Sequence, residues 1–226
     1  MIPLKDTIPS RSYPVVTLTL IVINILVFLY ELSLGEKLSE FFDIFGVVPA
    51  TYFELKESEA PLLLIYYPFL TSMFLHGGWM HLIGNMIYLW VFGDNVEDRM
   101  GHFRYLLFYV LCGVAAGLTH VYTNPASEIP AVGASGAISG VLGAYFILFP
   151  HSRVITLIPI FFFYDLVEIS AFIFLGLWFL IQFFSGVASL GAATYATSGG
   201  VAWWAHIGGF VAGFLLSFVF ARRGRY

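Results

Sequence analysis

The strongest constraint in this sequence is a charge-free apolar run near its start. From Tyr13 to Tyr30 the chain reads YPVVTLTLIVINILVFLY, and Glu31 is the first charged residue after Arg11. A helix that crosses the ~30 Å hydrocarbon core of a bilayer needs about 20 mostly apolar residues. The run meets this requirement, and no small-residue cleavage site follows it. We therefore expect a retained membrane-spanning helix rather than a cleaved signal peptide.

Similar apolar segments recur along the chain and predict an all-α membrane protein, a six-transmembrane helical bundle in one domain, 1–226. Composition agrees, because 59% of the residues are hydrophobic and only 11% are charged, whereas a soluble domain has about 25% charged residues. Such a chain lacks the basic surface of a nucleic-acid-binding protein. Its single cysteine excludes an intramolecular disulfide and a cysteine-based metal site. We expect spans near 13–34, 79–96, 105–122, 135–149, 170–189 and 201–220.

The connection between the first two spans is too long for a turn and too apolar for a free linker. Residues 35–74 contain eight charged residues and three prolines among apolar stretches. We expect a structured loop that lies partly in the membrane interface. A second apolar stretch, 154–166, contains Pro159 and Asp165, so we also expect an interfacial loop there rather than another helix.

The distribution of basic residues predicts the orientation. With a cytoplasmic N-terminus, eight of the ten Lys and Arg residues lie on the cytoplasmic side, as the positive-inside rule requires. We therefore expect both termini in the cytoplasm and a multi-pass protein in the cell (inner) membrane. The sequence contains no internal repeat, so it does not support the inverted-repeat architecture of transporters. The eight residues are Lys5, Arg11, Arg99, Arg104, Arg153, Arg222, Arg223 and Arg225.

Four polar residues inside the predicted spans are our candidates for function, because polar side chains within a membrane indicate function. His81 and Asn85 are four residues apart and share one helical face. Ser135 begins the fourth span and His206 lies in the sixth. Counted at 1.5 Å per residue from the arginine at the cytoplasmic end of each span, all four lie roughly 21 to 27 Å above that end. Residues from three helices can thus converge.

Small residues allow two of these helices to approach closely. The fourth span carries Gly136 and Gly140, and the sixth carries Gly209 and Gly213 on the same face as His206. Close packing of these faces brings the serine toward the histidine.

A serine beside a neutral histidine points to nucleophilic catalysis, because the histidine can take the hydroxyl proton. The oxyanion that forms then needs hydrogen-bond donors, which the Asn85 amide, the His81 ring and the Ser135 backbone N–H can supply. We include Gly133 among the residues that stabilise the oxyanion or substrate. Every Asp and Glu lies in a loop or near a membrane face. We therefore expect a Ser-His dyad without an orienting carboxylate.

The motifs resemble those of the rhomboid intramembrane serine proteases. The matching segments, in order, are HGGWMHLIGN, FGDNVEDRMG, GASG and AHIGG. The resemblance implies the bacterial six-helix form and cleavage of transmembrane protein substrates within the lipid bilayer, without cofactor or metal.

By motif position the resemblance makes Ser135 the nucleophile and His206 the base, with His81 and Asn85 at the oxyanion. Some members carry a tyrosine one turn after the serine that stacks on the histidine. Here that position is Ser139, so the base must be oriented by another group. Some members also carry a Trp-Arg dipeptide, which does not occur in this sequence.

Several alternatives compete with this interpretation. An inactive rhomboid-like module that binds or escorts membrane helices predicts a lost serine or histidine, and both are present. A zinc protease needs the His-Glu-x-x-His motif, which does not occur. An aspartyl protease needs two embedded aspartates, but Asp94 and Asp165 lie toward the cytoplasmic face. A transporter or channel is suggested only by the intramembrane histidines.

We expect the fifth span to be the moving wall of the site, that is, the helix whose movement lets substrate enter from lipid. The resemblance also implies entry beside this span. We find no catalytic candidate in it, and its outer half carries Phe179, Phe183 and Phe184, which either plug a lateral gap or face lipid.

Overall fold

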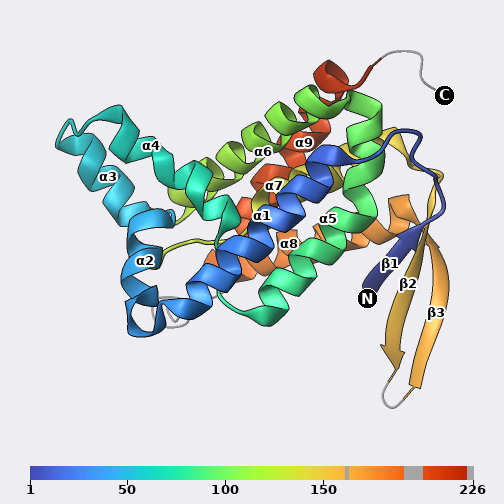
Figure 1. Cartoon of the computed structure of the whole chain (residues 1–226), viewed down its shortest axis with the longest axis horizontal. Helices are drawn as coiled ribbons and strands as arrows, with labels where there is room; N and C mark the ends of the chain where they lie inside the picture. The colour runs from blue at the N-terminus through green and yellow to red at the C-terminus, as the bar shows by residue number, and fades with distance from the viewer. Residues whose placement is uncertain (161–162, 191–200, 223–226) are drawn as a thin grey trace.

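The computed structural model describes residues 1–160, 163–190 and 201–222, and helices dominate it (Figure 1). In the described part of the chain, four helices are long and apolar enough to cross a membrane, as expected for a multi-pass membrane protein. They are α1 (Val15–Ser33), α6 (His102–Thr123), α8 (Ala171–Leu190) and α9 (Trp203–Phe220). In α8 the candidate span is Ala171–Ser189. The other two expected spans correspond to α5 (Trp79–Met100) and α7 (Ser135–Leu148), and their crossing of the membrane stays a prediction.

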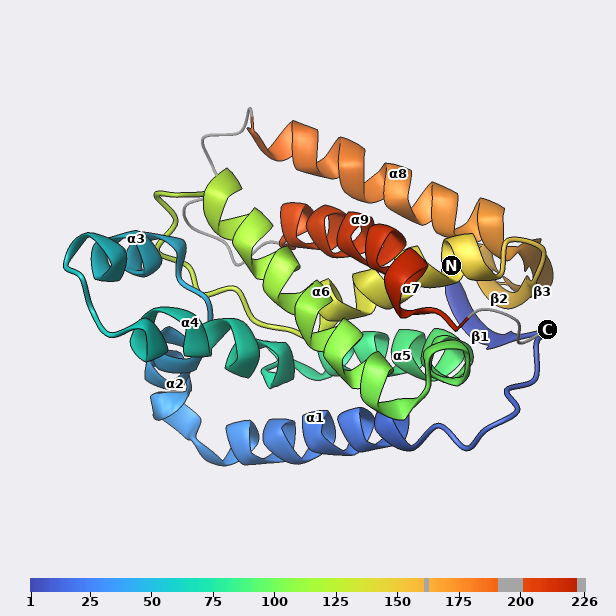
Figure 2. The same cartoon turned by 90° about the horizontal axis from the view of Figure 1, so that it is seen from above.

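The short helix α7 occupies the middle of the bundle. It packs against α5, α6, α8 and α9 (Figure 2). Its sequence, SGAISGVLGAYFIL, is rich in small residues, which permit close packing on several sides. A Cβ atom at Gly213 of α9 would overlap the Gly140 carbonyl oxygen of α7. The two helix backbones are therefore in direct contact.

A buried carboxylate joins α1 to α5. Glu97 of α5 accepts hydrogen bonds from the backbone N–H groups of Val16 and Thr17 at 2.9 and 2.8 Å. The first N–H groups of a helix have no partner within that helix, so Glu97 satisfies donors that would otherwise be unpaired. This contact fixes the start of α1 on the bundle.

Residues 35–74 are structured, as expected, and they form short helices beside the bundle (Figure 1). Tyr52, Ile65 and Phe69 build a small second core with Val121 of α6. The location of this lobe in the membrane interface stays a prediction. Its elements are η1 (Gly35–Lys37), α2 (Leu38–Phe45), α3 (Pro49–Glu57), α4 (Leu62–Thr71) and η2 (Ser72–Phe74).

The all-α prediction was wrong in one respect, because the chain also contains an antiparallel sheet of order β1-β2-β3. Its strands are β1 (Ile2–Asp6), β2 (Arg153–Ile160) and β3 (Phe163–Ser170). The stretch 154–166 is thus part of a hairpin rather than an irregular loop. Its many β-branched residues favour strands, and Val154 and Thr156 are fully buried. The N-terminal segment then adds a third strand.

The sheet and the end of α9 lie at one end of the bundle, away from α2, α3 and α4 (Figure 1). There Thr7 N–H donates to the Arg153 carbonyl at 3.0 Å, and Arg222 N–H donates to the Arg99 carbonyl at 3.1 Å. Several of the basic residues assigned to the cytoplasmic side therefore gather at this end. That this end faces the cytoplasm stays a prediction. Arg223, Arg225 and the loop 191–200 lie outside the described residues.

Candidate active site

Ser135 and His206 meet where α7 and α9 begin. The Ser135 Oγ lies 2.8 Å from the His206 Nε2. Both residues are only half-buried, whereas their neighbours Ala134 and Ala205 are buried. The nucleophile and base expected from the sequence are thus in hydrogen-bond contact, and each keeps part of its surface exposed.

Glycine packing explains this contact. A Cβ atom at Gly209, which lies three residues after His206, would overlap the Gly136 carbonyl oxygen. The backbones of α7 and α9 therefore touch within one turn of the serine and the histidine. Any larger side chain at Gly209 would separate them.

His81, on α5, lies against the segment that precedes Ser135. Its Nδ1 accepts a hydrogen bond from Gly77 N–H at 3.4 Å, which leaves the ring proton on Nε2. Gly133 has a φ of +133°, and a Cβ atom there would lie 2.7 Å from the His81 Nε2 and 3.5 Å from the Ser135 Oγ. The N–H of Gly133 itself donates to the Ser72 carbonyl at 2.9 Å. Gly133 thus provides room for the His81 ring, while its own N–H is engaged.

Asn85 is held by a residue that the sequence analysis did not assign to the site. The Asn85 Nδ2 lies 3.0 Å from the Nε2 of His76, which is buried just before α5. Burial, with a smaller contribution from His81, lowers the pKa of His76 to about 4. Its neutral ring therefore accepts the amide hydrogen bond and orients the Asn85 side chain.

A buried glutamate holds His76 in turn. The His76 N–H donates to both carboxylate oxygens of Glu31 at 3.2 and 3.3 Å. In the sequence analysis, His76 appeared only as the first residue of the segment HGGWMHLIGN without an assigned role, and Glu31 only marked the end of an apolar run. A carboxylate inside a predicted span, which is 13–34 here, was the available signal.

The second nitrogen of His206 contacts α8. Its Nδ1 lies 2.7 Å from the Oε1 of Gln182, and the Trp178 ring lies 6.0 Å from the imidazole. The sequence analysis assigned no residue of this helix to the site, although the structure places Gln182 against His206. Gln182 is the only charged or amide side chain in AFIFLGLWFLIQFFSGVASL, and this was the missed signal. Ser139 does not replace it, because its hydroxyl donates to the Ser135 carbonyl at 2.6 Å.

The three phenylalanines of the expected moving wall differ in their surroundings. Phe179 packs on Phe210 of α9, with ring centroids 4.7 Å apart. Phe183 and Phe184 are 40% and 65% exposed, as side chains that face lipid would be. Movement of α8 stays a prediction.

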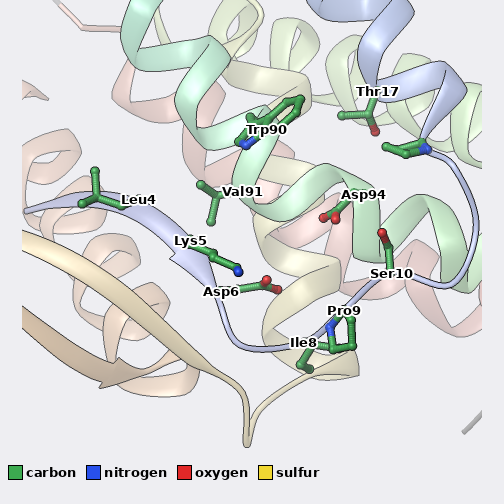
Figure 3. A pocket seen from close by; sticks show the side chains of 11 residues that line it. Leu4, Lys5, Asp6, Ile8, Pro9, Ser10, Thr17, Trp90, Val91 and Asp94 are labelled. Atoms are coloured by element: carbon green, nitrogen blue, oxygen red, sulfur yellow. The ribbon is translucent and has the colours of Figure 1, made fainter.

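A separate pocket of about 480 Å³, lined by both polar and apolar residues, lies near β1 (Figure 3). Asp6 and Asp94 line it. Asp165 instead lies exposed on β3, opposite Ile158, so these residues do not form the pair of an aspartyl protease. Within the described residues, no three His, Cys, Asp or Glu side chains are grouped to hold a metal.

Burial strongly affects one carboxyl group of this pocket. Asp6 accepts hydrogen bonds from the Asn95 amide at 2.7 Å and from the Tyr145 hydroxyl. Burial, together with the charge of Asp94, raises the pKa of Asp6 to about 6 despite these hydrogen bonds.

Comparisons with known proteins agree with these motifs. The family profile described as "Rhomboid domain" matches residues 65–223. RHOMBOID-like protein 5 of Arabidopsis thaliana is 33% identical over 157 residues, which are 70% of this chain and 45% of that protein. Rhomboid protease GluP of Bacillus subtilis is 33% identical over 136 residues, which are 60% of this chain and 25% of that protein. The matched part of the chain spans less than half of either relative.

Proposed function

The chain belongs to the rhomboid family, and we propose that it is a serine protease that cleaves peptide bonds in or near the transmembrane segments of other membrane proteins. The observation that carries this proposal is the 2.8 Å contact between the Ser135 Oγ and the His206 Nε2. The protease named among its relatives supports it further.

In the proposed reaction, the His206 Nε2 accepts the Ser135 proton while the Oγ attacks the carbonyl carbon of the scissile peptide bond. The tetrahedral intermediate collapses to an acyl-enzyme, and the histidine gives its proton to the leaving amine. A water molecule, deprotonated by the same nitrogen, then attacks the ester and releases the second product. The partial exposure of both residues supports access by water.

Three donors are proposed to stabilise the oxyanion. The His81 Nε2 lies against Gly133, two residues before the serine, and the Asn85 amide is oriented by His76. The Ser135 N–H lies in the first turn of α7, where backbone donors lack helical partners. We assign Gly133 a spatial role, because its N–H already donates to Ser72.

We place the protein in the cell (inner) membrane with six spans and both termini in the cytoplasm. In this orientation the dyad lies in the outer part of the bilayer. Its partners are single-span or multi-span membrane proteins, which enter from lipid, and the structured lobe 35–74 rests in the interface.

The decisive experiment compares the wild-type protein and Ser135→Ala in detergent, with a fluorescent single-span membrane protein as substrate. Cleavage by the wild type alone is the expected result. The matched control is Ser139→Ala, which removes a neighbouring hydroxyl that is bound to backbone and should leave cleavage intact. Binding of the substrate without cleavage by the wild type would instead support the inactive helix-binding module.

A further inference from the structure

The base of the proposed dyad has a hydrogen-bond partner on a neighbouring helix. Gln182 is only 6% exposed, although it lies in the otherwise apolar helix α8. A buried amide is unfavourable in an apolar environment unless it is hydrogen-bonded. Its Oε1 lies 2.7 Å from the His206 Nδ1, so the side chain has a partner, and that partner is the base.

This contact determines which ring nitrogen carries the proton. A neutral imidazole has one N–H and one acceptor nitrogen. Since an amide oxygen can only accept, the proton lies on the His206 Nδ1 and is donated to Gln182. The lone pair of Nε2 then faces the Ser135 hydroxyl, 2.8 Å away. The other tautomer would present an N–H to the serine and could not remove its proton.

Within the described residues, α8 supplies the hydrogen-bond partner of the His206 Nδ1 and one of its two Trp neighbours, the other being Trp203 of α9. Ser139, where a stacking tyrosine would stand, donates its hydroxyl to the Ser135 carbonyl. Trp178, one helical turn before Gln182, lies with its ring 6.0 Å from the imidazole and tilted by 33°. One helix face thus supplies both an acceptor and an aromatic neighbour for the histidine.

We propose that Gln182 is the positioning residue of the dyad: it holds the His206 ring in the orientation and tautomer that present Nε2 to Ser135. This proposal rests on the proposed protease function. An amide does so without placing a charge in the membrane, where a carboxylate is unfavourable.

Two substitutions separate this role from packing. Gln182→Met keeps the length of the side chain but removes the acceptor. Gln182→Glu keeps an acceptor oxygen and is studied in buffer alkaline enough to ionise the new carboxyl. Leu175→Met is the control, because Leu175 is a fully buried residue of the same helix and the exchange of Leu for Met is well tolerated.

The first measurement is the rate at which a fluorophosphonate labels Ser135, together with kcat and KM for the fluorescent substrate. For Gln182→Met we expect labelling and kcat to fall by about 10- to 100-fold with little change in KM. Gln182→Glu should retain much more activity than Gln182→Met, and Leu175→Met should match the wild type. If Gln182 acted only by packing, Gln182→Glu would be less active than Gln182→Met, because a buried charge would disturb the helix more than a methionine side chain does.

The second measurement does not require activity. Nitrogen chemical shifts of isotope-labelled histidine, with His206→Ala to identify the signal, report the tautomer of His206. The Nδ1–H form should dominate in the wild type and be lost in Gln182→Met. If the wild type neither cleaves nor is labelled, the proposed function fails, while this measurement still decides whether Gln182 sets the tautomer. An unchanged tautomer or wild-type labelling in Gln182→Met would overturn the proposal.

Discussion

The buried carboxylate of Glu31, near the end of α1, accepts two hydrogen bonds from the backbone N–H of His76. Since the His76 ring orients Asn85, the first helix is connected to the proposed oxyanion site. The conformation of the segment between η2 and α5 therefore depends on a residue 45 positions away in the sequence.

Glu31→Leu should destabilise the protein by about 1–3 kcal/mol, because it leaves the buried His76 N–H without an acceptor. The cleavage rate should fall as well, because Asn85 loses its orientation. The measurement is thermal unfolding in detergent alongside the cleavage rate. Glu36→Leu, at an exposed position of η1, is the control and should leave both unchanged. Equal stability of the two variants would contradict the role of the Glu31 contact.

Ser135→Ala and His206→Ala should each abolish cleavage without loss of helical structure. The double variant should be no worse than either single variant, because the two residues act as one catalytic unit. Cleavage rates and circular dichroism test this expectation. Substantial activity in both single variants would exclude the serine protease mechanism.

Asn85→Ala and His81→Ala should reduce turnover by about 10²- to 10³-fold each, the usual effect of losing one oxyanion donor. The Ser135–His206 contact persists in both variants, so the fluorophosphonate should still label the serine, though more slowly. Turnover at the wild-type rate in both variants would assign these side chains a structural role only.

Gly133→Ala should impair the site more than Gly35→Ala. Both glycines have a positive φ, +133° and +54°, so both substitutions strain the backbone. Only at Gly133 would the added Cβ meet the His81 ring, whereas no atom lies within 4 Å of the corresponding position at Gly35. Thermal unfolding reports the backbone strain, which is larger at Gly133 because +133° lies outside the left-handed region that other residues can adopt, and the cleavage rate reports the displacement of the His81 ring. Similar activity of both would show that the His81 contact is unimportant.

Asp6 should make stability depend on pH. Burial raises its pKa from 3.8 to about 6 in the folded protein, so the folded state binds a proton more tightly than the unfolded state does. The contribution of Asp6 to stability is therefore largest below pH 3.8, decreases as the pH rises toward 6, and is smallest above it. Asp6→Asn keeps a side-chain oxygen as acceptor but does not titrate. The difference between the unfolding temperatures of wild type and Asp6→Asn should thus change across this range, and a constant difference would contradict the shift.

Much of the fold could be read from the sequence. The apolar runs predicted α1, α6, α8 and α9, because the length of an apolar segment is a local property that the bilayer selects directly. The small residues of α7 and α9 also indicated which helix faces touch. The segment 153–170 was misjudged, because its strands are stabilised by pairing with each other and with β1, and the sequence does not display that pairing.

The proposed site divides in the same way. Ser135, His206, His81 and Asn85 could be predicted from the sequence, because polar side chains stand out in apolar segments and helical spacing gives their face and depth. The groups that hold them, Gln182 on His206 and His76 on Asn85, became visible in the folded bundle alone. A hydrogen bond between helices depends on their relative rotation and depth to within about an ångström. Those quantities result from packing of the whole bundle and leave no periodic pattern along the chain.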